Sequence, residues 1–261
     1  MFSPNKTVIS IDLKGMIASG SRAPLNMDNL NGLFSKVMKI KFDALSIVIN
    51  SPGGSPVQSS LIAQKIREIS DKKKVKCYCF VEDVAASGGY WLACAADEIF
   101  ASKASIIGSI GVVSSGFGFD KAIKKIGVDR RLYTSGENKA ILDPFLPENK
   151  DDIKRLKDIQ KELHNQFISF VKSRRGSKIT NENKDLFSGA FWSGEKSLEL
   201  GLIDDYGEMK SVLKQRFGEN VKIKEFAPKK KLFGFSNLFS GAIDIIINKI
   251  EERISFKKFG L

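Results

Sequence analysis

The sequence predicts an α/β fold, in which short apolar strands alternate with helices. Two apolar runs, Leu45–Ile49 and Val75–Val81, each lead into a turn with a glycine pair and then into a helix-compatible segment. Strand–helix units also recur before and after them, as is typical of parallel sheets covered by helices. The chain has 261 residues, of which 42% are hydrophobic, so it is long enough to bury a sizeable core as one domain.

Each element is predicted from its hydrophobic period. In the strand predicted at 8–13, apolar and polar residues alternate from Ile9 onward. In the helix predicted at 149–172, apolar residues lie mostly three or four positions apart. In the first part of the chain we expect strands at 8–13, 45–49 and 75–81, each followed by a helix, at 30–40, at 61–69 and from 87 to about 96. After these we expect a strand at 98–101, a glycine-rich segment at 107–113, a helix near 121–126, a strand at 129–133 and a long helix at 149–172.

The composition changes near the C-terminus. A linker is expected at 228–231, followed by a helix from 238 to about 254 with one apolar face. Between 222 and 261 there are nine Lys or Arg and four Asp or Glu residues. A basic amphipathic helix can lie on a membrane surface, dock on a partner subunit or cap its own domain. We therefore expect a domain at 1–227 and a basic amphipathic tail at 228–261.

Charge and cysteine content argue against two classes of function, nucleic-acid binding and zinc binding. The net charge of +12 has no nucleic-acid motif beside it, so we expect no nucleic-acid partner. Cys77, Cys79 and Cys94 have no second pair to complete a zinc site and are expected to be reduced and buried. Neither a signal peptide nor a run of 18 apolar residues is present. We expect a cytoplasmic or peripherally membrane-associated protein.

The two glycine-rich turns suit acyl-transfer chemistry. Ser87 is predicted at an exposed helix start, where backbone N–H groups are free to bind a developing oxyanion. Gly53 and Gly54 let the backbone approach a bound carbonyl closely. Taken singly, Ser87 could be an ordinary N-cap and the glycine pair an ordinary turn. Their equivalent places in successive strand–helix units favour a shared site.

Several motifs together carry a family resemblance. The chain resembles the signal peptide peptidase A (SppA/SohB) family of serine peptidases from about residue 8 to about residue 214. The motifs are Asn50-Ser51-Pro52-Gly53-Gly54, Ala85-Ala86-Ser87-Gly88-Gly89-Tyr90-Trp91, Gly108-Ser109-Ile110-Gly111-Val112, Gly136-Glu137-Asn138-Lys139, Leu142-Asp143-Pro144-Phe145, Phe191-Trp192-Ser193-Gly194 and Leu200-Gly201-Leu202-Ile203-Asp204. The resemblance implies a ClpP/crotonase-like fold, a spiral of repeated strand-strand-helix units. Many relatives carry an N-terminal membrane anchor, so their membrane placement does not transfer automatically to this chain.

The catalytic base must be a lysine or a carboxylate. The single histidine, His164, is predicted as a helix residue remote from such a role. The resemblance points to Lys139 as base and to Ser109 as the residue that orients it. A lysine has an ordinary pKa of about 10.4, and burial lowers such a value by roughly 3–5 units. We expect the backbone N–H groups of Gly54 and Gly88 to form the oxyanion hole.

The resemblance implies an ATP-independent serine endopeptidase with a Ser-Lys dyad and no metal or organic cofactor. Its substrates would be signal peptides or other unfolded apolar segments, in a groove involving Ile106, Ile107 and Ile110. Relatives form homo-oligomeric rings in which the dyad can meet across a subunit boundary. Two alternatives stay open, a catalytically silent scaffold or membrane-recruited binding module, and a crotonase-like acyl-CoA enzyme.

Overall fold

The computed structural model describes residues 6–20, 23–179, 183–228, 250 and 252–261, and these contain one eight-stranded sheet. Its strands are β1 (Thr7–Lys14), β2 (Ala44–Ser51), β3 (Cys77–Ala86), β4 (Glu98–Ala101), β5 (Ile106–Gly108), β6 (Phe191–Ser193), β7 (Asp205–Tyr206) and β8 (Lys222–Phe226). The main path runs β6-β5-β3-β2-β1-β8, while β4 pairs with β3 and β7. Every pairing is parallel except β5 with β6. The predicted α/β fold is confirmed.

The helices match the hydrophobic periods closely in the first half of the chain. They are α1 (Met27–Met38), α2 (Pro56–Lys73), α3 (Gly88–Ala93), α4 (Asp120–Lys125), α5 (Lys150–Arg175), α6 (Gly194–Glu199) and α7 (Met209–Phe217), with a short 3-10 turn at Gly176–Lys178. The side chain of Asn26 caps α1, and that of Ser55 caps α2, which has a proline in its first turn. Such caps satisfy amide groups that a helix start leaves free.

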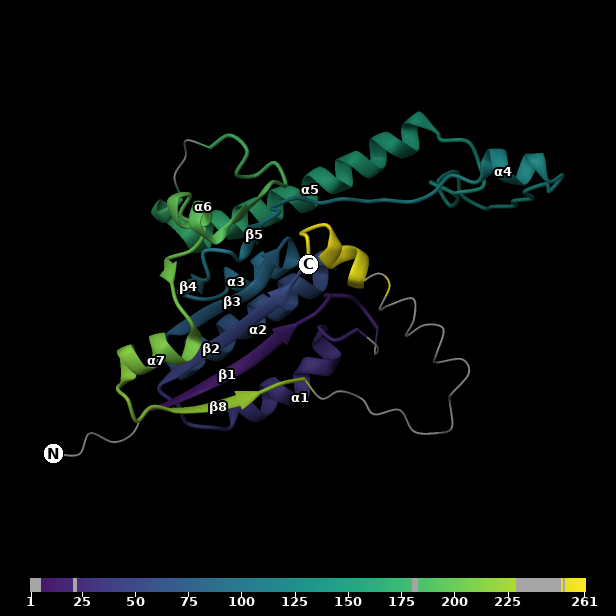
Figure 1. The fold of residues 1–261 in the computed structure, drawn as a ribbon. Helices are drawn as coiled ribbons and strands as arrows, with labels where there is room; N and C mark the ends of the chain where they lie inside the picture. The colour runs from purple at the N-terminus through teal and green to yellow at the C-terminus, as the bar shows by residue number, and fades with distance from the viewer. Residues whose placement is uncertain (1–5, 21–22, 180–182, 229–249, 251) are drawn as a thin grey trace. The chain divides into compact units, whose positions relative to one another are not determined.

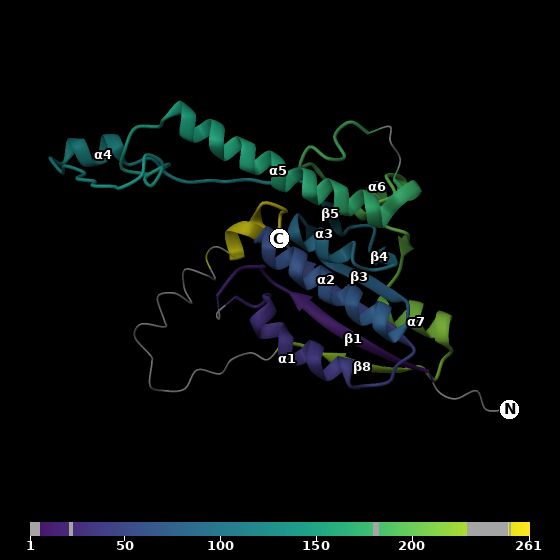
Figure 2. The same ribbon diagram turned by 180° about the vertical axis from the view of Figure 1, so that it is seen from behind.

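Two layers of helices cover the sheet. Alternate residues of β1, including Ile9 and Ile11, join the main core with α1, α2 and α3. On the opposite face, Val8, Tyr78 and Phe80 pack with Val212 and Leu213 of α7. Figures 1 and 2 show α1 and α2 on one face and α7 on the other. The carboxyl ends of β1, β2, β3 and β5 therefore meet at one edge of the sheet.

The chain divides into two compact units. Unit 1 comprises residues 1–111 and 167–261 and contains the sheet, and unit 2 comprises residues 112–166. Helix α5 contributes residues 150–166 to unit 2 and its last residues to unit 1. Within unit 1, Trp91 of α3 stacks on Phe167 and Phe170 of α5, with ring centroids 4.6 and 5.5 Å apart.

One strand predicted from the sequence does not form in unit 2. The strand expected at 129–133 is absent, and these residues form an irregular segment. Arg130 binds Asp143 (2.8 Å) and lies over the ring of Phe145, and Phe119 donates its amide to the carbonyl of Pro144 (2.6 Å). No strand of the described residues pairs with this segment, and an isolated strand is not stable in water.

Among the described residues, none of the helices has the length and apolar composition needed to span a membrane. The predicted linker at 228–231 and most of the predicted helix at 238–254 fall on residues 229–249 and 251, outside the described residues. Residues 252–257 are helical. The division into a domain at 1–227 and a tail stays a prediction.

Candidate active site

Ser87 occupies a strained turn between β3 and α3. Its backbone has φ 52° and ψ −121°, a conformation that residues with a Cβ rarely adopt. The turn is held on both sides, because the amide of Ser87 donates to the carbonyl of Gly108 (2.8 Å) and its own carbonyl accepts from Trp91 (3.0 Å). The Ser87 residue remains partly exposed. The sequence pattern correctly predicted this position at the start of a helix.

The loop of Gly53 and Gly54 packs directly on this turn. A Cβ added to Gly53 would lie 2.7 Å from the amide nitrogen of Gly88 and 2.8 Å from the Cβ of Ser87. Gly88 also has little room, since its Cβ would lie 2.4 Å from the Oγ of Ser59 and 3.3 Å from the amide nitrogen of Gly54. Only glycines allow two backbone segments to approach so closely. The two predicted oxyanion residues are therefore neighbours beside Ser87.

Both amides are available to a ligand. The N–H of Gly54 donates no hydrogen bond within the described residues, although the flanking Ser55 amide donates to the carbonyl of Ile17 (2.7 Å). Gly88 is the first residue of α3, so its N–H has no acceptor inside the helix, and the described residues supply none from outside it. Two such donors at a helix start can bind the oxygen of a polarised carbonyl.

Ser109 lies next to Ser87 in the strand register. β3 and β5 pair through Ala86 and Gly108, so Ser87 and Ser109 are the next residues on each strand. Ser109 also has φ 52°, and its amide donates to the carbonyl of Ala190 (2.7 Å). The structure brings Ser87, Ser109, Gly54 and Gly88 together at the carboxyl edge of the sheet in unit 1.

The three predicted groove residues differ in burial. Ile107 and Ile110 have no exposed surface and belong to the core; Ile107 lies on β5, an interior strand between β3 and β6, and Ile110 follows it in the chain. Ile106 is partly exposed. Of the three, only Ile106 has side-chain surface to offer a substrate in the single chain.

An exposed apolar residue that the sequence did not single out is Phe191. It pairs with Gly108 across β5 and β6 and is 45% exposed. Its motif, Phe191-Trp192-Ser193-Gly194, was identified in the sequence, but the antiparallel pairing that places it beside the site was not.

Lys139 belongs to unit 2, where it lies in a turn. Its amide donates to the carbonyl of Gly136 (3.2 Å), and its side chain is exposed in the single chain. The flanking Ala140 and Ile141 are half-buried. The burial that the sequence interpretation requires for a basic lysine is thus not provided by this chain alone. His164 lies on α5, as predicted.

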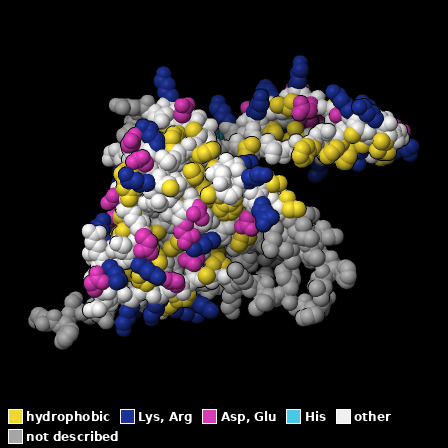
Figure 3. All heavy atoms as spheres, in the orientation of Figure 1, with side chains coloured by type: hydrophobic (Ala, Val, Ile, Leu, Met, Phe, Trp, Pro, Cys, Tyr) yellow, Lys and Arg dark blue, Asp and Glu magenta, His cyan; other side chains and the backbone are white. Residues whose placement is uncertain are grey.

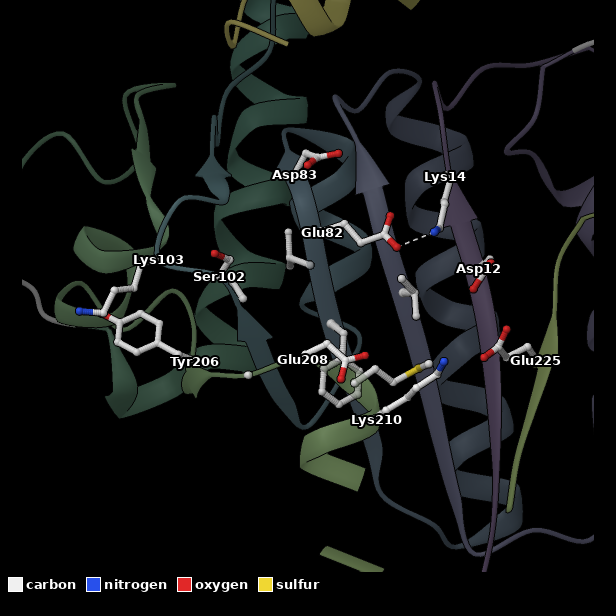
Figure 4. Close-up of a pocket in the computed structure, with 16 residues that line it drawn as sticks. Asp12, Lys14, Glu82, Asp83, Ser102, Lys103, Tyr206, Glu208, Lys210 and Glu225 are labelled. Carbon is white, nitrogen blue, oxygen red and sulfur yellow. Dashed lines mark hydrogen bonds and ion pairs between the residues drawn. The ribbon is translucent and has the colours of Figure 1, made fainter. Parts of the chain in front are cut away.

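A separate cavity of about 720 Å³ opens on the α7 side of the sheet. Figure 4 shows its charged lining, with Lys14 pointing to Glu82 at 2.5 Å. Burial raises the pKa of Asp12, and the carboxylates of Glu225 and Glu82 raise it further. None of the predicted site residues lines this cavity. The described residues contain no group of three His, Cys, Asp or Glu side chains arranged to hold a metal ion.

Comparison with known proteins identifies related chains. The profile of Peptidase family S49 matches residues 69–224. A protein of Enterococcus faecium named for the signal peptide peptidase SppA is 29% identical over 216 residues, which cover 80% of this chain and 62% of that protein.

A Brucella abortus protein named Na(+)/H(+) antiporter NhaA is 50% identical over 228 residues. The match covers 86% of this chain and 31% of that protein. It therefore includes most of the region matched by the peptidase profile, and the antiporter name describes a protein about three times as long. The chain spans less than two thirds of the length of either relative.

Among solved structures, a variant of the 1510-N membrane-bound stomatin-specific protease has the same fold. The two share 18% identity with a TM-score of 0.53, covering 87% of this chain and 100% of that chain. This similarity confirms the predicted fold class.

Proposed function

The chain belongs to peptidase family S49, which includes the SppA and SohB proteases, and on this premise we propose that it is an ATP-independent serine endopeptidase. Ser87 is the nucleophile, Lys139 is the general base, and unfolded apolar peptide segments, signal peptides among them, are the substrates. No metal or organic cofactor takes part in the proposed reaction.

The observation that carries the proposal is the geometry of Ser87. Its hydroxyl stands at a strained strand-to-helix turn, next to the backbone amides of Gly54 and Gly88, which have no acceptor among the described residues. Strain of this kind costs about 1–3 kcal/mol and persists where the surrounding structure enforces it, often at functional sites. A turn that served only to join β3 to α3 would not need this conformation.

The proposed chemical steps use these groups. The Oγ of Ser87 attacks the carbonyl carbon of the scissile peptide bond while Lys139 accepts the hydroxyl proton. The tetrahedral oxyanion receives hydrogen bonds from the amides of Gly54 and Gly88. Lys139 then gives the proton to the leaving amine, and water hydrolyses the ester on Ser87 with the same lysine as base.

Ser109 is proposed as a positioning residue. It stands beside Ser87 in register, at the end of the neighbouring strand. A hydroxyl there can accept a hydrogen bond from the ammonium group of Lys139 and donate one to its neutral amine. Its role would be to hold the lysine toward Ser87.

We further propose that a second copy of the chain covers unit 2, as part of a homo-oligomeric ring. Unit 2 exposes large apolar side chains, with Phe117 81% and Tyr133 90% exposed, and Figure 3 shows such side chains gathered along it. Apolar surface on this scale marks an interaction site. Covering it would also remove water from around Lys139, which the proposed base requires. A peripheral membrane contact through 228–261 stays a proposal from the sequence alone.

The test is the cleavage of an unfolded apolar peptide by the wild type, Ser87→Ala and Lys139→Ala, compared at the same oligomer size. Ser173→Ala and Lys154→Ala serve as matched controls, because both side chains are exposed on α5. The proposal expects cleavage by the wild type and both controls and none by the two site variants. If Ser87→Ala still cleaves the peptide, the nucleophile is wrong. If no protein cleaves it and Ser87 is inert to a serine-directed probe, the peptidase proposal fails.

A further inference from the structure

β3 contains a bulge shortly before Ser87. In the parallel register of β2 with β3, the pairs on either side of the irregularity are Ile49 with Val81 and Ser51 with Ala85. From the first pair to the second, β2 advances by two residues and β3 by four. Residues 82–84 of β3 therefore lie opposite Asn50 alone. Bulges are common next to active sites, where they change the aim of a side chain.

The bulge decides which residue of the oxyanion loop stands beside Ser87. A register continued from Ile49 and Val81 without the bulge would bring Ser55 level with Ser87. With the bulge, Gly53 comes level with Ser87, and a Cβ added to Gly53 would lie 2.8 Å from the Cβ of Ser87. Because side chains alternate with a period of two, an insertion of two residues moves Ser87 along the sheet without turning it to the other face.

At the same point β3 changes its neighbour on the other side. It pairs with β4 up to Val81 and with β5 from Val84 onward. Within the described residues, Glu82 and Asp83 therefore take part in no strand pairing. A stretch of backbone without strand pairing needs other hydrogen-bond partners to hold one conformation.

Two polar side chains hold the bulge. Ser105, which is 2% exposed and directly precedes β5, donates its hydroxyl to the carbonyl of Glu82 (2.5 Å). Asn50 donates its side-chain amide to the carboxylate of Asp83 (2.6 Å), a charge-assisted bond. Figure 4 shows that Glu82 also points to Lys14. Those two side chains are 41% and 44% exposed, and an exposed ion pair contributes little.

Asn50 also belongs to the oxyanion loop. It is the first residue of the motif Asn50-Ser51-Pro52-Gly53-Gly54, and its carbonyl accepts the amide of Gly15 (2.9 Å). Ser87 follows Asp83 by four residues. The bond between Asn50 and Asp83 therefore joins the start of the oxyanion loop to the segment that carries Ser87. The proposed reaction gives neither of these two polar side chains a role.

We propose that Asn50 and Asp83 are positioning residues, which hold the β3 bulge in its observed register. By holding the bulge, they keep Ser87 level with Gly53 and beside the oxyanion donors. They act through the backbone of the two segments and not on the substrate. This inference rests on the proposed function for its catalytic consequence.

The first test is cleavage of an unfolded apolar peptide. Asn50→Asp would set two carboxylates against each other, and it should lower kcat about 10- to 100-fold with KM unchanged, since a misplacement of about 1 Å has effects of this size. Adding Asp83→Asn gives a swapped pair, again one amide and one carboxylate, which should recover most of the kcat. Asp43→Asn is the control, because this carboxylate accepts from Lys6 (2.9 Å) and the amide of Thr7 (2.8 Å) near the other end of the same strands. It should leave kcat unchanged.

Hydrogen exchange tests the positioning without any cleavage. The amide of Ser87 donates to the carbonyl of Gly108 (2.8 Å), so its exchange rate reports how firmly the turn is held. Asn50→Asp should speed this exchange about 10-fold or more, and the swapped pair should return it to the wild-type rate. The amide of Leu45, which donates to the carbonyl of Lys76 (3.0 Å) at the other end of β2, should exchange equally in all three proteins.

The two measurements separate this inference from the peptidase proposal. If the wild type cleaves the peptide, an unchanged kcat in Asn50→Asp would overturn the inference. A fall in kcat that the swapped pair does not reverse, or a rise in KM in place of that fall, would also overturn it. If the wild type cleaves nothing, the peptidase proposal fails and the exchange rates decide. Equal Ser87 exchange in all three proteins would then overturn the inference, and faster exchange that the swapped pair reverses would support it.

Discussion

Ser87 and Ser109 both have a positive φ, 52° at each, at the adjacent ends of β3 and β5. The two strands are locked at this point by the hydrogen bond from the Ser87 amide to the Gly108 carbonyl. Each turn redirects its chain at the same edge of the sheet. Because the two strained residues are neighbours in register, the strain belongs to one site rather than to two unrelated turns.

Replacing Ser87 by glycine should separate stability from function. Glycine adopts a positive φ without steric cost, so Ser87→Gly should be more stable than Ser87→Ala by about 1 kcal/mol, the strain relief exceeding the entropy cost of glycine. Both variants should lose peptide cleavage. Urea unfolding of the two proteins, alongside a cleavage assay, measures both effects. A glycine variant less stable than the alanine variant would show that the turn is not strained.

Gly53→Ala should disable the oxyanion loop. The added Cβ would lie 2.7 Å from the Gly88 amide nitrogen and the Ala86 carbonyl, so the loop must move away from Ser87. Loss of one oxyanion donor reduces kcat by about 10²–10³-fold. Gly20→Ala is the matched control, because Gly20 has the same φ of +99° but no atom within 4 Å of the new Cβ. It should lose a little stability and keep its kcat. Equal kcat values for the two variants would argue against a role for the loop.

The buried pair of Arg175 and Asp204 should control acid stability. Burial raises the pKa of Asp204, but hydrogen bonds from Arg175 (2.7 Å) and Lys178 (2.6 Å) outweigh it and leave the pKa below its ordinary value. A carboxylate of this kind stabilises the fold above its unfolded-state pKa, and that stability is lost as the pH falls through the folded-state pKa. Asp204→Asn should lower the free energy of unfolding by about 3–5 kcal/mol at pH 7, because it leaves Arg175 buried without its counter-ion.

The pH profile of unfolding provides the check. The difference between the wild type and Asp204→Asn should start to shrink as the pH falls below about 4, where the carboxylate of the unfolded chain becomes protonated, and should continue to shrink until the folded carboxylate is protonated as well. Asp185→Asn, on an exposed carboxylate, is the control and should follow the wild type throughout. A constant difference from pH 7 to pH 3 would mean that the ion pair is not the source of the stability.

The sequence predicted the structure best where a hydrophobic pattern extended over many residues or where a turn required glycine. The strands β1, β2 and β3 and the helices α1, α2 and α5 follow from hydrophobic spacing, and the Ser87 turn follows from its glycines. The strands β6, β7 and β8 were missed because they are two to five residues long and half-exposed. Their stability comes from pairing with β5, β4 and β1, which lie far away in the sequence. Residues 129–133 had a strand-like pattern but found no partner.

The site was predictable only in part for a similar reason. Ser87, Gly54 and Gly88 are brought together by consecutive strand–helix units, which local patterns reveal. Phe191 reaches the site through an antiparallel pairing across about 80 residues of sequence, which no local pattern encodes. For Lys139, resemblance named the residue, but its environment depends on what covers unit 2, and a single chain does not contain that information.

Mixing two inactive variants should show whether the dyad forms between copies. Lys139→Ala chains retain Ser87, and Ser87→Ala chains retain Lys139. Lys139 is exposed on unit 2, beside apolar side chains that a second copy is proposed to cover. If the lysine serves a neighbouring chain, co-expressed variants form intact sites at about a quarter of random ring contacts. Cleavage should then reappear in the mixed oligomer, and addition of a third variant, Ser87→Ala with Lys139→Ala, should dilute it. Mixed oligomers of the correct size without any cleavage would place both residues of a working dyad within one chain, and the cover over unit 2 would then act only by excluding water from it.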